Sequence, residues 1–156
     1  MSAQDISIQQ PPLQLESSFF QRLEINAEKS PAPEGSGGEY RFGFTADLSV
    51  NNQDPLQYRV DIGVNGAAVD DGWAPYRFQV DIFGIFRLPE EREDKEKLLL
   101  LTGAAMLYGA AREMLSIVTG RLPWGAFVLP TVSPDIFLQV ARQRSKPNPP
   151  TTQPGR

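Results

Sequence analysis

The sequence predicts an α+β domain in which a four-stranded antiparallel meander carries one long and one short C-terminal helix on one face. Two observations predict this fold. Four segments between residues 13 and 88 alternate apolar with polar side chains, as strands with one buried face do. Residues 98–119 are instead rich in Leu, Ala and Met, lack charge as far as residue 111, and stop before a glycine. This helix supplies the layer that the apolar face of the sheet requires.

Clusters of Asn, Asp and Gly separate the later strands, and a break rich in Pro, Gly and Ser follows the first. We expect the strands at residues 13–26, 40–50, 58–64 and 76–88. In the first strand, Phe20 and Gln21 interrupt the alternation. Its apolar members otherwise share one parity: Leu13, Leu15, Phe19, Leu23 and Ile25.

The end of the fourth strand and the long helix both predict self-association. Phe83 and Ile85 place apolar side chains on the otherwise polar parity of the strand. In the helix, glycine costs up to about 1 kcal/mol relative to alanine, and close packing of two backbones can offset that cost. We therefore expect the helix to pack on its own sheet and on a second subunit, with Phe83, Ile85, Gly103, Tyr108 and Gly109 at the interface.

The composition excludes several classes of function. The 15 Lys and Arg against 19 Asp and Glu give a net charge of −4, and no basic stripe supports binding to nucleic acid. The uncharged run of the long helix is shorter than the roughly 18 residues that a membrane span needs. The N-terminal residues show no signal-peptide pattern, so we expect a cytoplasmic protein that associates with no membrane.

No segment offers the residues of a catalytic or cofactor site. The chain has no Cys and no His, which removes thiol nucleophiles, imidazole bases and the usual zinc ligands. Asp70 and Asp71 fit a turn, Arg112 and Glu113 fit a structural pair in the helix, and no glycine-rich stretch has phosphate-binding spacing. We expect no enzyme and no cofactor. A small enzyme or ligand carrier with a cavity under the inter-helix connector is the alternative of another class.

Both ends of the chain are too poor in apolar groups to offset the entropy of ordering them. We expect a flexible segment at residues 1–12, one domain at residues 13–143, and a disordered, basic, proline-rich tail at residues 144–156.

The connector between the helices, residues 121–134, carries apolar side chains without helical periodicity. It contains three prolines together with Trp124, Phe127 and Leu129. A loop of this kind can close over a sheet without sealing it, which leaves an apolar groove for extended polypeptide. For Trp124 and Phe127 the sequence leaves groove and core equally open.

Three segments resemble the SecB family of bacterial export chaperones and its SecB-like relatives. They are FQVDIFGIFRL at residues 78–88, YGAAREMLSIVTGR at residues 108–121 and PWGAFVLPTVSPDIF at residues 123–137. The matched motifs are Gly84-Ile85-Phe86, Ala111-Arg112-Glu113 and Leu129-Pro130. The resemblance covers residues 13–143.

The resemblance implies a holdase that works without ATP, assembles as a dimer of dimers and binds non-native polypeptide in hydrophobic grooves. It places the client groove at Phe42, Phe44, Trp124, Phe127, Leu129 and Phe137.

Export members of the family present acidic side chains to the SecA motor. The corresponding positions here are Arg22, Asn26, Arg77 and Gln79, which argues against SecA as a partner. SecB-like proteins also serve toxin-antitoxin-chaperone modules, so the client is either one antitoxin or, in the alternative, exported preproteins in general.

Overall fold

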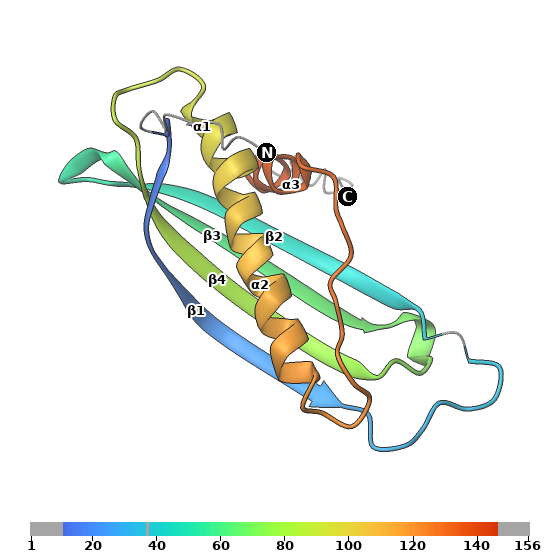
Figure 1. The fold of residues 1–156 in the computed structure, drawn as a ribbon. Helices are drawn as coiled ribbons and strands as arrows, with labels where there is room; N and C mark the ends of the chain where they lie inside the picture. The colour runs from blue at the N-terminus through green and yellow to red at the C-terminus, as the bar shows by residue number, and fades with distance from the viewer. Residues whose placement is uncertain (1–10, 37, 147–156) are drawn as a thin grey trace, which may run out of the picture.

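The computed structural model describes residues 11–36 and 38–146. One antiparallel sheet contains four strands: β1 (Gln14–Ala27), β2 (Tyr40–Asn51), β3 (Asp54–Ala68) and β4 (Tyr76–Arg87). The helical elements are η1 (Val69–Asp71), α1 (Lys95–Leu98), the π-helical turn η2 (Leu99–Gly103), α2 (Ala104–Thr119) and α3 (Ile136–Arg144). Apart from η1, they lie on one face of the sheet (Figure 1), which confirms the predicted fold class. Of the segments expected to be flexible (residues 1–12) and disordered (residues 144–156), residues 1–10 and 147–156 lie outside the described residues, and Arg144 forms the end of α3.

The strand order differs from a simple meander at one strand. β2, β3 and β4 follow one another as hairpins, but the order across the sheet is β1-β4-β3-β2. Residues 28–39 are long enough to cross the end of the sheet, so β1 pairs with β4 instead of β2. The arrangement is a Greek key. The expected meander therefore holds for three strands and is wrong for the first.

Two register shifts in β1 overturn the single parity expected for its apolar residues. They lie between Leu15 and Ser17 and between Phe20 and Arg22. Each extra residue moves the following side chains to the opposite face of the sheet. Phe20 therefore lies opposite Ile82 on the helix-covered face. Phe19 lies opposite Phe83 on the outer face and is 56% exposed.

The long helix packs on the sheet through its small residues. Gly103, Ala104 and Ala111 are buried, and a Cβ built on Gly103 would lie 3.3 Å from the Phe86 ring. The close approach at Gly103 is thus made to Phe86 within the chain, and its assignment to a subunit interface stays a prediction. A Cβ on Gly109, by contrast, meets nothing within 4 Å.

The four consecutive leucines at residues 98–101 explain the π turn between α1 and α2. Leu99 and Leu100 are buried, and Leu98 and Leu101 pack against the same core. A π turn widens the helix locally, which lets these side chains contact both the sheet and α3. By length and composition alone, the helical run Lys95–Thr119 could cross a membrane. Here it lies along the sheet as the core helix of the domain.

Candidate functional site

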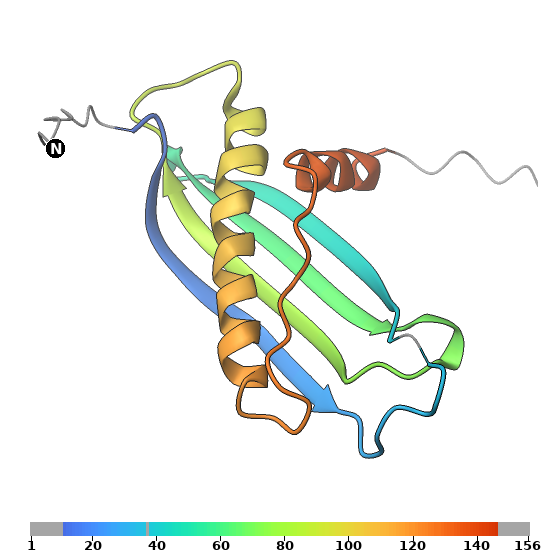
Figure 2. The ribbon, with the colours of Figure 1, turned by 45° about the vertical axis from the view of Figure 1, so that its right-hand side comes forward.

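The connector crosses the helix-covered face of the sheet between α2 and β2 (Figures 1 and 2). Two buried hydroxyls fix its start. The Tyr76 hydroxyl donates to the Gly125 carbonyl at 2.7 Å and accepts from the Trp124 amide at 3.1 Å. Thr119 Oγ1 accepts from the Phe127 amide at 2.7 Å. Backbone groups in a loop have no regular hydrogen-bond partners, and these bonds supply partners for three of them. The path of the connector is therefore set by Thr119 on α2 and Tyr76 on β4.

Aromatic rings gather beneath the first half of the connector. The Phe127 centroid lies 4.8 Å from that of Tyr40 and 5.5 Å from that of Phe78. Phe42 and Phe78 flank Gly66 in register, and a Cβ on Gly66 would lie 2.5 Å from the Phe78 ring. The missing side chain of Gly66 therefore makes room for these rings. We call Tyr40, Phe42, Phe44, Phe78 and Phe127 the aromatic row.

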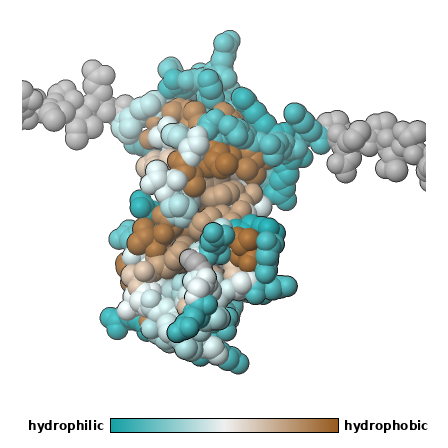
Figure 3. Space-filling model, turned by 90° about the vertical axis from the view of Figure 1, so that its right-hand side faces the viewer, coloured by the Kyte–Doolittle hydropathy of each residue, from teal (hydrophilic) through white to brown (hydrophobic). Residues whose placement is uncertain are grey.

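The aromatic row is incompletely covered. Tyr40, Phe42, Phe44 and Phe127 are only partly buried, although Phe78 belongs to the core. Figure 3, which views the β2 side of the molecule, shows apolar surface between polar margins. Burial raises the pKa of the Tyr40 hydroxyl, and the hydrogen bond that this hydroxyl accepts from the Tyr76 amide opposes the shift in part. Tyr40 therefore stays neutral, and the row presents uncharged aromatic surface.

A hollow of about 280 Å³ lies between α2 and the far half of the connector. We call it the helix–connector pocket; it is lined mainly by apolar groups of Ala105, Tyr108, Gly109, Val132, Pro134 and Phe137, with Arg112 and polar atoms of Thr131 and Ser133. The Tyr108 hydroxyl donates to the Pro130 carbonyl, and burial raises its pKa. Phe137 links the pocket to the aromatic row, because its ring lies 5.7 Å from Tyr108 and 6.0 Å from Phe44.

The structure brings together most of the predicted client-binding residues. Phe42, Phe44 and Phe127 share the aromatic row, partly exposed. Leu129 and Phe137 lie beside them but are 1% and 2% exposed, so they form the wall behind the row. Sequence reasoning missed Tyr40 as a member, although its parity matched that of Phe42 and Phe44.

Trp124 lies apart from the aromatic row. Its indole N–H donates to the Glu28 carbonyl at 2.7 Å, and its ring meets Trp73 edge-on at 5.7 Å. Trp73 in turn donates to the Ser30 carbonyl at 2.8 Å. Both tryptophans thus hold the β1–β2 connection against the end of the sheet, and this position places Trp124 outside the aromatic row.

The other residues assigned to a subunit interface lie in three environments. Phe83 and Ile85 are half-buried on the outer sheet face, where the Arg59 guanidinium lies 3.9 Å from the Phe83 ring centroid. Tyr108 is buried, and Gly109 is exposed on α2. Self-association through these residues stays a prediction.

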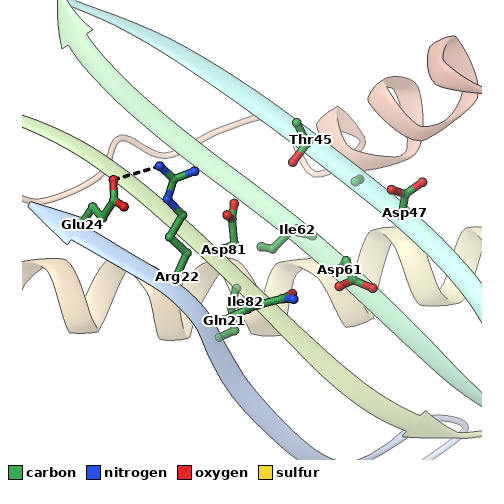
Figure 4. Close-up of a pocket in the computed structure, with 10 residues that line it drawn as sticks. Gln21, Arg22, Glu24, Thr45, Asp47, Asp61, Ile62, Asp81 and Ile82 are labelled. Atoms are coloured by element: carbon green, nitrogen blue, oxygen red, sulfur yellow. Dashed lines mark hydrogen bonds and ion pairs between the residues drawn. The ribbon is translucent and has the colours of Figure 1, made fainter.

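The outer sheet face carries a polar hollow of about 490 Å³, shown in Figure 4 with α2 behind the strands. Its carboxylates are engaged: Glu24 pairs with Arg22, Asp61 with Arg59, Asp47 with Arg144, and Asp81 accepts from Gln79. Among the described residues, no group of three or more His, Cys, Asp or Glu side chains could hold a metal. This face offers paired charges and no reactive centre, which leaves the aromatic row and the helix–connector pocket as the candidate site.

No protein-family model matches the chain, and no curated protein matches it. Among solved structures, it is similar to a SecB-like chaperone of Mycobacterium tuberculosis in complex with a ChAD peptide from the HigA1 antitoxin. The match has a TM-score of 0.63 at 17% identity and covers 78% of this chain and 91% of the other. The chain has the SecB-like fold. This confirms the resemblance at the level of the fold. A protein of unknown function from Streptococcus agalactiae is also similar, with a TM-score of 0.43 at 16% identity over 76% of this chain and 97% of that one.

Proposed function

We propose that the protein is a SecB-like chaperone that binds non-native polypeptide along the aromatic row without using nucleotide. The observation that carries the proposal is the incomplete cover of the row: Tyr40, Phe42 and Phe44 on β2 and Phe127 on the connector remain partly exposed. Covering each apolar side chain of a client there is worth roughly 1.5–3 kcal/mol. Such contacts need exposed apolar groups, which folded proteins bury, so the site selects non-native chains.

We further propose that the client is an antitoxin-type polypeptide. The similar chaperone from M. tuberculosis was solved with an antitoxin peptide. The outer sheet face carries Arg22 and Arg77 where export members present acidic groups to SecA, so the charge for that motor is missing. Capture of an antitoxin together with failure to bind purified SecA would support this assignment. Binding of SecA with submicromolar affinity would favour the general export role instead.

The experiment that tests the chaperone function compares Phe127→Ala with Trp124→Phe. Each variant is measured for suppression of aggregation of a chemically denatured client, with and without ATP. Phe127→Ala removes part of the aromatic row and should weaken suppression at least several-fold. Trp124→Phe removes the hydrogen bond from the indole N–H to the Glu28 carbonyl, which lies outside the aromatic row. Once folded, this variant should suppress aggregation as well as the wild type. Strict dependence on ATP, or no suppression by the wild type, contradicts the proposal.

We also propose that the protein acts in the cytoplasm as a homo-oligomer. The partly exposed apolar groups of Phe19 and Phe83 on the outer sheet face, and of Met106 and Ile117 on α2, support self-association. Sedimentation at micromolar concentration tests this, and a monomer would contradict it.

A further inference from the structure

We propose that the helix–connector pocket receives one apolar side chain of the client, and that Arg112 at its rim selects clients with a carboxylate beside that side chain. This inference rests on the proposed chaperone function and adds a charge preference to it. The pocket and the aromatic row are joined through Phe137, so one extended client can occupy both.

The size and floor of the pocket favour a single side chain. Its volume of about 280 Å³ is small, and ligand sites for whole small molecules begin near roughly 300 Å³. Gly109 lines it, and a Cβ there would meet no atom within 4 Å. Because Gly109 has no side chain, the pocket has open space beside it, and a residue from another chain can fill this space without moving protein atoms.

The charge at the rim is unbalanced. Within residues 11–36 and 38–146, Arg112 is the one charged residue that lines the pocket, and it forms no ion pair there. Most other arginines in this part of the chain, among them Arg59 and Arg142, do pair with a carboxylate. The neighbouring Glu113 is exposed and does not line the pocket. The rim thus presents a guanidinium whose donors are available to a partner.

A client that fills the pocket removes water from Arg112, and this loss of water determines which charge is favoured beside the bound side chain. A guanidinium that loses water without gaining a partner is costly, whereas a carboxylate beside the bound side chain forms a charge-assisted, bidentate pair. A lysine at the same place adds repulsion between like charges. We therefore expect client segments with an aromatic or large aliphatic residue next to Asp or Glu to bind tightest.

The test uses three fluorescein-labelled peptides that differ only beside a central tryptophan, which is followed by Glu, Gln or Lys. Fluorescence anisotropy gives the affinity of each for the full chain. The wild type should bind the Glu peptide at least tenfold more tightly than the Lys peptide. Arg112→Gln should abolish the difference, and Arg112→Glu should reverse it. Arg77→Glu, an equal charge change on the opposite sheet face, should leave the preference intact. Gly109→Leu should weaken all three peptides by a similar factor of ten or more.

Equal affinity of the wild type for the Glu and Lys peptides would overturn the inference while leaving the chaperone function standing. A preference that survives Arg112→Glu would overturn it as well. No binding of any peptide would instead sink the proposed function. A second copy of this chain is the rival occupant: if Arg112→Glu dissociates a wild-type oligomer in sedimentation and leaves the peptide preference unchanged, the pocket is a subunit contact. Circular dichroism confirms that each variant is folded.

Discussion

Replacing Thr119 by valine tests whether one buried hydroxyl holds the connector in place. Thr119 is fully buried at the end of α2, and its Oγ1 accepts from the Phe127 amide at 2.7 Å. Valine has nearly the same shape but no hydroxyl, so the change removes the acceptor and leaves the packing intact. Thr119 also donates to the Leu115 carbonyl, but that carbonyl has a second partner in the helix ladder.

The variant therefore leaves one partly buried N–H, that of Phe127 in the aromatic row, without an acceptor. Leaving a buried donor unpaired costs about 1–3 kcal/mol. In a protein of this size, each kcal/mol lowers the Tm by roughly 2–4 °C. We expect Thr119→Val to lower the free energy of unfolding in urea by about 1–3 kcal/mol and to expose the Phe127 amide to hydrogen exchange.

Thr119→Ser is the matched control, because it keeps the acceptor and loses one methyl group, worth about 0.8 kcal/mol. It should retain protection of the Phe127 amide. The reasoning fails if Thr119→Val keeps that amide protected and its free energy of unfolding lies within about 0.5 kcal/mol of the wild type, as for a typical surface substitution. The hydroxyl would then not anchor the connector.

Two further predictions concern packing and pH. Gly66→Ala places a Cβ 2.5 Å from the Phe78 ring and should cost about 1–3 kcal/mol by overpacking, whereas Gly109→Ala meets open space in a helix and should stabilise by about 0.5–1 kcal/mol; urea unfolding of both tests the reasoning, which fails if the two shifts share a sign. The Arg87 guanidinium holds the pKa of Asp54 below its ordinary value of 3.8. The pair of Asp54 with Arg87 thus contributes its full stabilisation above pH 3.8, and this contribution is lost as the pH falls through the lowered pKa of Asp54. Asp54→Asn should flatten this acid limb of a Tm-against-pH curve, and an unchanged limb would contradict the assignment.

The sheet, the helices and most of the groove residues could be predicted because alternation and helical composition report which side chains are buried. The placement of β1 could not, since pairing with β4 depends on where a twelve-residue connection (residues 28–39) leads, and short-range patterns do not contain that information. The two bulges left a trace in the sequence, because Phe20 broke the alternation. Phe127 was found from its type and its place in the connector, and Phe42 from the resemblance to the SecB family. Thr119 was not, since an isolated threonine at a helix end carries no pattern.

Trp124 shows a different limit. An aromatic residue in a proline-interrupted loop fits a groove and a clamp equally well, and the choice depends on whether a carbonyl lies within reach of its N–H. That carbonyl belongs to Glu28, 96 residues away in the chain.

The π turn at residues 99–103 has a consequence for any comparison of this helix with others. A π turn accommodates one residue more than the α-helical turn it replaces. Residues 95–98 and 104–119 are therefore one position out of phase, although they form a single continuous rod. An alignment with a relative that lacks the turn needs a one-residue gap within the leucine run. Without the gap, either Lys95 and its neighbours or the residues around Arg112 would be matched to the wrong face.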